Sequence, residues 1–185
     1  MRILFIALVL FAFTANAQQP LIRKDKITIA RDSYGVPHIF APTDPEVAYG
    51  LAYAHSEDDF KTIQTLILTG KGKLGTYLGK KGAPVDFVFG LLNTRKVVDQ
   101  QIKSMDPRFL QLVQGYLLGL EAYGKAHPSE VLNKHIFPIA LEDYIATTMF
   151  SGLGVSMMSN PPGLSTRRAS STSMRRASNP MCSTR

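Results

Sequence analysis

The chain has 185 residues, which is enough for one domain with a hydrophobic core. Its formal net charge of +7 would suit nucleic-acid binding, but residues 164–185 contain five arginines and no carboxylate. Residues 18–163 carry 15 basic and 14 acidic side chains, so the composition of this body gives no support for nucleic acid as a partner. Cys182 is the only cysteine, which excludes a disulfide within the chain.

The N-terminus has the pattern of a secretory signal peptide. Met1-Arg2 supplies a positive start, residues 3–13 are an apolar run, and Ala15-Asn16-Ala17 has the small-x-small form of a signal-peptidase site. The apolar run is short for a membrane span and polar Gln18 follows it, although an uncleaved anchor is the alternative. We therefore expect residues 1–17 to be cleaved and the mature protein to be exported, without a stable membrane span.

Two short strands and a turn come next. Residues 27–31 alternate and are rich in β-branched side chains, and residues 36–40 have a similar pattern. Residues 32–35 supply turn residues, because Gly35 can adopt positive φ. Pro37 has no amide hydrogen, so the second strand should begin late or lie at an edge. This stretch predicts a β-hairpin.

Helices are predicted for the rest of the body. The sequence Thr43-Asp-Pro-Glu46 is a capping box, whose hydroxyl and carboxylate should bind exposed amides at a helix start. The apolar pattern that follows continues to about Leu68 without a proline, and Gly70-Lys-Gly72 ends it. A weaker helical pattern covers residues 84–103.

Two further helices are predicted towards the end of the body. Asp106-Pro107 combines a capping aspartate with a proline at the first helical position, where no amide hydrogen is needed. That helix should end near Gly124. Its buried stripe should consist of Phe109, Leu112, Val113, Tyr116, Leu117 and Leu120. The last helix should run from about residue 141 to Phe150.

The segment 161–185 differs from the body in composition. It is rich in serine, threonine and arginine, shows no periodicity, and repeats Arg-Arg-Ala-Ser at 167–170 and 175–178. A kinase site, a disordered tail and a shifted reading frame would each account for this composition. We expect a disordered or out-of-frame tail.

One cluster of residues raises the question of a metal or acid/base site. Residues 53–60, Tyr-Ala-His-Ser-Glu-Asp-Asp-Phe, should place His55, Asp58 and Asp59 on one helix face. A zinc site would need three ligands without surplus charge, and a calcium loop would need a non-helical backbone. We favour a solvated or salt-bridged helix face. Residues 70–75 match the G-x-G-x-x-G pattern of a dinucleotide-binding loop, but no strand precedes them, so a turn is expected.

The stretch from residue 28 to residue 79 resembles the opening of the penicillin acylase family. The resemblance rests on Arg31-Asp32, Tyr34-Gly-Val-Pro-His-Ile39, Tyr49-Gly50, His55, Glu57-Asp58 and the glycine-rich segment 70–79. Members of this family are exported N-terminal-nucleophile (Ntn) amidohydrolases, which include acyl-homoserine lactone and lipopeptide acylases. The resemblance implies that residues 18–160 are part of the smaller α chain of a bacterial, periplasmic or secreted enzyme. It also implies that the His55 cluster ties a helix to its surroundings.

For the fold, the resemblance implies an α+β structure. The α-chain fragment should be mainly helical with an N-terminal β-hairpin, and should form part of the four-layer αββα Ntn-hydrolase fold. For the activity, it implies hydrolysis of the amide bond of an acylated small molecule, such as an N-acyl homoserine lactone, a penicillin or a lipopeptide.

The family's catalytic serine is not found in this chain. In the family it is the first residue of the β chain, freed by self-cleavage, usually within Gly-Ser-Asn, and its own α-amine is the general base. This sequence has no Gly-Ser dipeptide, and no G-x-S-x-G or S-x-x-K motif. We therefore expect no catalytic residue here, a missing β chain as the partner, and no hydrolysis by this chain alone.

The family's α chain lines the acyl pocket with its last helix. Here Ile145, Met149, Leu153 and Met157 share one helix face, with Phe150 beside it. Two interpretations are open: Met149, Phe150, Leu153 and Met157 bind substrate, or the same stripe is ordinary core packing. No cofactor is implied. Some family members bind calcium through an α-chain glutamate beyond this helix, but no acidic residue follows Asp143, so we expect no metal site.

An exported, non-catalytic helical binding module is the alternative function. A separately encoded β chain would favour the acylase, whereas a promoter and stop codon that isolate this frame would favour the binding module.

Overall fold

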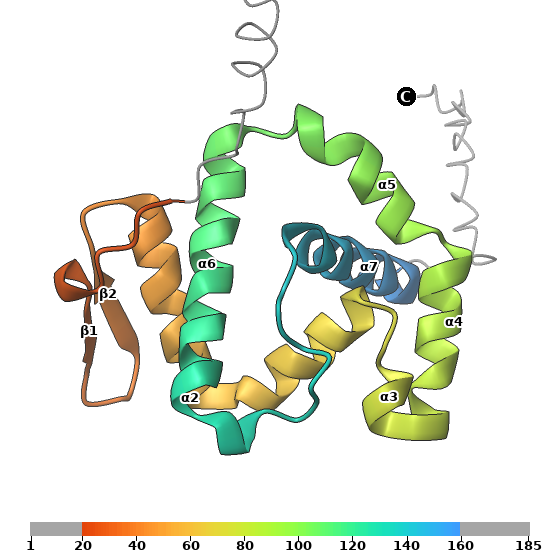
Figure 1. Cartoon of the computed structure of the whole chain (residues 1–185), viewed down its shortest axis with the longest axis horizontal. Coiled ribbons are helices and arrows are strands. Elements are labelled where there is room, and N and C mark those ends of the chain that lie inside the picture. Colours follow the sequence, from red (N-terminus) through yellow and green to blue (C-terminus); the bar gives the residue numbers. More distant parts are fainter. Residues whose placement is uncertain (1–19, 160–185) are drawn as a thin grey trace, which may run out of the picture.

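The structure is a computed structural model that describes residues 20–159, with side chains to residue 153. A two-stranded hairpin of β1 (Thr28–Arg31) and β2 (Pro37–Phe40) precedes the helices (Figure 1). The helices are α2 (Asp44–Gly70), α3 (Gly75–Leu78), α4 (Ala83–Leu91), α5 (Thr94–Gln101), α6 (Pro107–Ala126) and α7 (Leu141–Ser159), with 3₁₀ turns η1 (Lys24–Lys26), η2 (Gly79–Lys81), η3 (Ile102–Ser104) and η4 (Pro128–Glu130). The expected mainly helical fold with an N-terminal hairpin is confirmed. The predicted signal peptide, residues 1–17, and the predicted tail, residues 161–185, lie outside the described residues.

The hairpin packs against the first turns of α2. Its strands pair antiparallel, from Thr28 opposite Phe40 to Arg31 opposite Pro37, and Gly35 has φ +82° in the turn as predicted. Gly50 of α2 makes the contact close, because a Cβ there would lie 2.7 Å from Cγ2 of Ile39. The hairpin is therefore held to α2 by its inward-facing isoleucines.

Helices α2 and α6 lie side by side and make the most extensive contact between elements (Figure 1). Two glycines of α6 allow this close approach. A Cβ at Gly115 would clash with the backbone of Pro45, and one at Gly119 would clash with the Tyr49 carbonyl and lie 2.8 Å from Cβ of Ala52. The main core surrounds this pair and consists of Ala52, Ile67, Leu68, Leu74, Val113, Leu117, Leu120, Ile136 and Ile139.

The start of α2 differs from the predicted capping box. The Thr43 hydroxyl donates to the Glu46 carboxylate (2.8 Å) and makes no bond to a helix amide. Glu46 is fully buried and accepts three bonds from Arg23, from its amide (3.1 Å), Nε (2.8 Å) and Nη2 (3.0 Å). These bonds lower the pKa of Glu46 to about 2, against the opposing effect of burial. The predicted bonds from Thr43 and Glu46 to helix amides were wrong, because Arg23, 23 residues away in the sequence, binds the Glu46 carboxylate instead.

Two of the predicted helices are interrupted. Asp59, inside α2, has φ −157° and ψ 70°, and its carboxylate accepts the Thr62 amide (3.0 Å), so it caps the second segment of the helix. The segment 84–103 forms two helices, α4 and α5, because Asn93 between them adopts φ +53°. The glycine-rich segment contains a turn, as predicted, but continues into the short helix α3.

Helix α6 starts as predicted, since the Asp106 side chain accepts the Arg108 amide (2.8 Å). It ends at Ala126, just past the predicted glycine. Its stripe is only partly buried: Val113, Leu117 and Leu120 lie in the core, whereas the predicted members Phe109 and Leu112 are exposed.

Helix α7 lies in the middle of Figure 1 and contacts α2, α5 and α6. Ile145 and Ala146 form a second, smaller core cluster with Phe89 of α4 and Val98 of α5. Across residues 20–159, none of the helices combines the length and apolar character that a bilayer crossing requires.

Candidate functional site

The side chains of the His55 cluster point to different partners. Nδ1 of His55 lies 3.2 Å from the hydroxyl of Tyr116 on α6. Arg31 of β1 binds both Glu57 (3.0 Å) and Asp58 (2.9 Å). Asp59 caps the second half of α2, so the predicted helix face shared with His55 does not extend to it. These contacts connect α2 to β1 and α6.

This arrangement offers no metal centre within residues 20–159, where no group of three or more His, Cys, Asp or Glu side chains could hold an ion. Tyr116 is also not poised as a base, because burial and the neighbouring Tyr144 raise its pKa to about 12. Its hydroxyl therefore stays protonated at neutral pH.

Helix α7 carries the predicted substrate-binding residues on its partly exposed side. Met149 is 37% exposed and Leu153 is 46% exposed, whereas Ile145 on the same stripe is buried. Phe150 is half-buried and makes an edge contact with Phe89, with ring centroids 5.5 Å apart. Met157 belongs to α7, but its side chain is outside the described ones. The assignment of Met149, Phe150, Leu153 and Met157 to substrate binding stays a prediction.

A groove of about 280 Å³ lies on the opposite side of α7. It is lined by Ile63, Leu66, Ile67, Tyr116, Tyr144, Thr147, Thr148 and Ser151. The four residues from α7 recur at helical spacing, about half a turn away from Met149 and Leu153. The sequence did not single out this groove, because its walls come from three helices that are distant in the chain.

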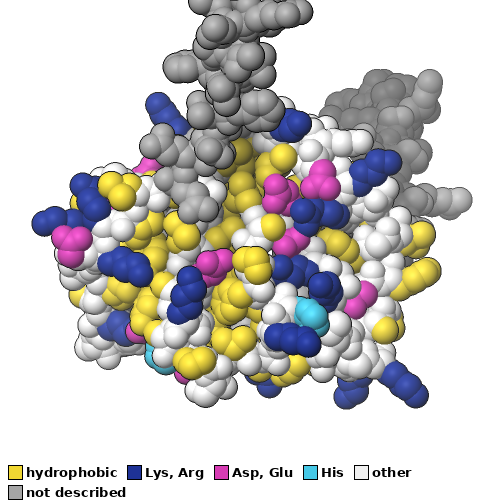
Figure 2. All heavy atoms as spheres, in the orientation of Figure 1, with side chains coloured by type: hydrophobic (Ala, Val, Ile, Leu, Met, Phe, Trp, Pro, Cys, Tyr) yellow, Lys and Arg dark blue, Asp and Glu magenta, His cyan; other side chains and the backbone are white. Residues whose placement is uncertain are grey.

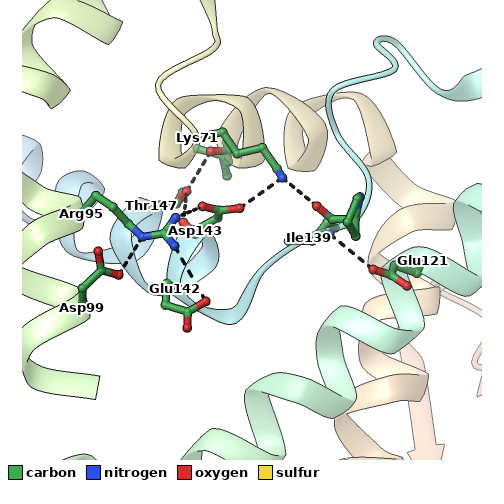
Figure 3. A network of polar contacts seen from close by, with 10 residues as sticks. Lys71, Arg95, Asp99, Glu121, Ile139, Glu142, Asp143 and Thr147 are labelled. Carbon is green, nitrogen blue, oxygen red and sulfur yellow. Dashed lines mark hydrogen bonds and ion pairs between the residues drawn. The ribbon is translucent and has the colours of Figure 1, made fainter. Parts of the chain in front are cut away.

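The buried end of α7 is held by a polar network (Figure 3). Asp143 is 6% exposed, and one of its carboxylate oxygens lies 3.1 Å from Nζ of Lys71. The other oxygen pairs with Nη1 of Arg95, whose Nε binds Asp99 (2.9 Å) and whose Nη2 lies 4.0 Å from Glu142. The network joins α7 to the end of α2 and to α5.

No pattern in the sequence pointed to these residues. An acidic side chain in the first turn of a helix is favourable without any partner, so Asp143 carried no distinct signal. Its partners Lys71 and Arg95 are 72 and 48 residues away in the sequence, and only the packing of α2, α5 and α7 brings them together.

Comparison with known proteins gives a consistent result. A family model described as penicillin amidase matches residues 26–174. This match passes beyond α7 into the segment 161–185, and the assignment of that segment to a disordered or out-of-frame tail stays a prediction.

Curated relatives are acyl-homoserine lactone acylases of Pseudomonas. The chain is 29% identical over 133 residues to PvdQ of Pseudomonas savastanoi pv. phaseolicola, covering 65% of this chain and 17% of the relative. It is 28% identical over 158 residues to PvdQ of Pseudomonas putida, covering 77% and 20%, and 26% identical over 97 residues to QuiP of Pseudomonas aeruginosa, covering 52% and 12%. The chain thus spans at most about a fifth of the length of these relatives.

A solved structure supports the same fold. The thermostable penicillin G acylase from Alcaligenes faecalis aligns with a TM-score of 0.57 at 23% identity, over 68% of this chain and 71% of the matched chain. The two coverages are close, so the matched chain is similar in length to this one.

Proposed function

The chain belongs to the penicillin amidase family, and we propose that it is the α-chain part of an exported acylase. The complete enzyme would hydrolyse the amide bond of an acylated small molecule, with an N-acyl homoserine lactone, a penicillin side chain or a lipopeptide as the candidate substrates. Its partner would be the β chain of the same precursor. The relatives are bacterial, and the N-terminal signal-peptide pattern supports a periplasmic or secreted location.

The observation that carries this proposal is the apolar surface at one end of the molecule. Phe87 and Leu91 of α4 are 70% and 71% exposed, and Met149 and Leu153 of α7 are 37% and 46% exposed. Figure 2 shows apolar side chains at the surface over α4, at the right edge of the view. Large exposed apolar patches usually mark an interaction surface. The β chain is the proposed cover.

The hairpin supports the same proposal. β1 and β2 form a sheet of two strands only, so each strand has a free edge among the described residues. A two-stranded sheet is marginal by itself and is stabilised by further strands or by a packed helix. Here α2 covers one face, while Phe40 and His38 on the other face are exposed. The remaining layers of the sandwich would come from the β chain.

In the proposed reaction the two chains have separate roles. The freed β-chain serine would attack the amide carbonyl, with its own α-amine as the base, and donors of the β chain would stabilise the oxyanion. This chain would contribute Met149, Phe150, Leu153 and Met157 to the acyl pocket, where flexible methionines accommodate chains of different shape. We further propose that this chain alone hydrolyses nothing, because its sequence has no Gly-Ser bond for self-cleavage.

The test begins with the DNA downstream of codon 155, read in all three frames. We expect a Gly-Ser-Asn sequence and a β chain in one of them. Two proteins are then purified, residues 18–185 and the precursor with a continuous frame. Both are assayed on an acyl-homoserine lactone and on a chromogenic acyl amide.

The expected outcome is turnover by the continuous precursor, after cleavage into two chains, and none by residues 18–185. Replacing the new serine by alanine in the precursor is the control and should abolish both cleavage and turnover. Turnover by residues 18–185 that is lost on mutating one of its own side chains would overturn the proposal. If no downstream frame encodes a β chain, the exported, non-catalytic binding module becomes the better interpretation.

A further inference from the structure

Asp143 is a buried carboxylate that no step of the proposed reaction uses. Its two oxygens face different elements: one pairs with Lys71 at the end of α2, and the other with Arg95 on α5 (Figure 3). A buried carboxylate is unfavourable unless it is paired with good geometry. The position of this end of α7 is therefore coupled to the positions of both cations.

Other polar contacts hold the same half of α7. Lys71 Nζ also donates to the carbonyl of Pro138 (2.7 Å), in the segment that leads into the helix. The Thr147 hydroxyl lies 2.9 Å from the carbonyl oxygen of Leu66 on α2. It lies so close to Gly70 that a Cβ there would clash with it. All these anchors lie in the first two turns of α7 or in the segment that leads into it.

The second half of α7 is held differently. Beyond Thr147, none of the described side chains of this helix makes a hydrogen bond to another element, and Phe150 rests on Phe89 by an apolar contact. Apolar contacts are non-directional, so they fix burial but permit rotation and sliding. Two ion pairs from different elements fix the orientation of the α7 axis, which the apolar contacts do not.

We propose that Asp143 is a positioning residue, whose pairs with Lys71 and Arg95 set the alignment of α7 and thereby the acyl specificity of the complete enzyme. The inference rests on the proposed function. Met149 and Leu153 follow Asp143 by six and ten residues, which is about 9 and 15 Å along the helix axis. A tilt of about 5° at Asp143 therefore moves Leu153 by roughly 1 Å. Displacements of about that size in a reacting complex cost up to about a hundredfold in rate.

The first experiment measures the alignment of α7 without any substrate. The sequence contains no tryptophan, so Leu153→Trp gives the 185-residue chain a single fluorescent reporter far from Asp143. Adding Asp143→Asn should lower the fluorescence anisotropy of this tryptophan and shift its emission, while far-UV circular dichroism stays unchanged. Asp99→Asn is the matched control, because it removes another carboxylate from the same arginine without touching α7.

The second experiment uses the two-chain enzyme with its natural Leu153. We expect Asp143→Asn to change the ratio of kcat/KM for an octanoyl over a dodecanoyl homoserine lactone by about tenfold, mainly through KM. Asp99→Asn should leave this ratio unchanged. Where Asp143→Asn fails to fold, Lys71→Met removes one of the two ion pairs and replaces it in both experiments.

The outcomes separate this inference from the proposed function. A folded Asp143→Asn variant with unchanged anisotropy, or with an unchanged substrate ratio, would overturn the inference. An inactive wild-type two-chain enzyme would refute the proposed function, and the anisotropy result would then decide alone whether Asp143 aligns α7.

Discussion

The α2–α6 pair and the end formed by α4 and α7 use apolar residues in opposite ways. In the α2–α6 pair, glycines at 115 and 119 bring the backbones into contact, and Leu117 and Leu120 of α6 are buried in the main core. At the other end, apolar side chains of similar size stand on the surface. Around the two glycines the helices cover each other, whereas Phe87 and Leu91 of α4 stay exposed among the described residues.

This difference separates residues that fold the chain from residues that would act on a partner or substrate. A core that packs to interior density is sensitive to the addition or removal of single methylene groups. Exposed apolar residues contribute little to the stability of the isolated chain, because they gain nothing from folding. Their contribution should appear only in the complete enzyme.

The largest effect should come from adding methyl groups between α2 and α6. We expect the double substitution Gly115→Ala and Gly119→Ala to lower the free energy of unfolding by about 4 kcal/mol, because each new Cβ meets backbone atoms that cannot move away. Urea denaturation followed by circular dichroism measures this.

The matched control for the glycine pair is Gly90→Ala in α4. A Cβ at Gly90 meets nothing within 4 Å. Alanine should therefore raise stability there by up to about 1 kcal/mol, through its better helix propensity. If both sets of substitutions behaved alike, the close approach of α2 and α6 would not be what holds this region together.

A smaller effect should come from removing side chains of one type from each region. Leu120→Ala should cost about 3 kcal/mol, since Leu120 is fully buried in the main core. Leu91→Ala should change the stability of the isolated chain by less than about 0.5 kcal/mol, because Leu91 is mostly exposed.

The substitution Leu91→Ala should have a larger effect in the two-chain enzyme than in the isolated chain. Leu91→Ala should weaken association with the β chain or destabilise the complex, as measured by thermal unfolding of both chains together. A Leu91→Ala variant that is neutral in the complex as well would show that the β chain does not cover α4.

The parts of this structure that the sequence predicted depend on local signals. Gly35 in its turn and Asp106-Pro107 at the start of α6 act within a few residues, and both behave as expected. The break at Asp59 was missed because no proline or glycine marks it, and the break at Asn93 because asparagine is tolerated in many conformations. Local patterns predicted where the helices lie in the sequence but could not show where they break.

The candidate site shows the same limit more strongly. Helical periodicity placed Ile145, Met149 and Leu153 on one face, but it could not show that Ile145 is buried while the other two are exposed. Burial depends on which elements pack against α7. For the same reason, the pairing of Asp143 with Lys71 and Arg95 had no signature in the sequence, and the resemblance to a family indicated only the helix on which to look.

The last prediction concerns the pH dependence of stability at the start of α2. Glu46 has an ordinary pKa of 4.5, which the bonds from Arg23 lower to about 2 in the folded chain. A carboxylate with a lowered folded-state pKa favours the folded state above its unfolded pKa, and this contribution is lost as the pH falls towards the folded pKa. Glu46 should therefore make the chain progressively less stable between about pH 4.5 and pH 2.

Glu46→Gln removes this titration. We expect the variant to have a lower melting temperature than the wild type at pH 7, where the charged pair is lost, and a gap that narrows as the pH falls below 4.5. Melting temperatures at pH 7, 4 and 3 measure the gap, and Asp44→Asn in the same helix turn is the control. A constant gap at all three pH values would mean that the pair with Arg23 does not control the charge of Glu46. Because Arg23 precedes the hairpin, that result would also mean that its bonds to Glu46 do not stabilise the contact between the N-terminal segment and α2.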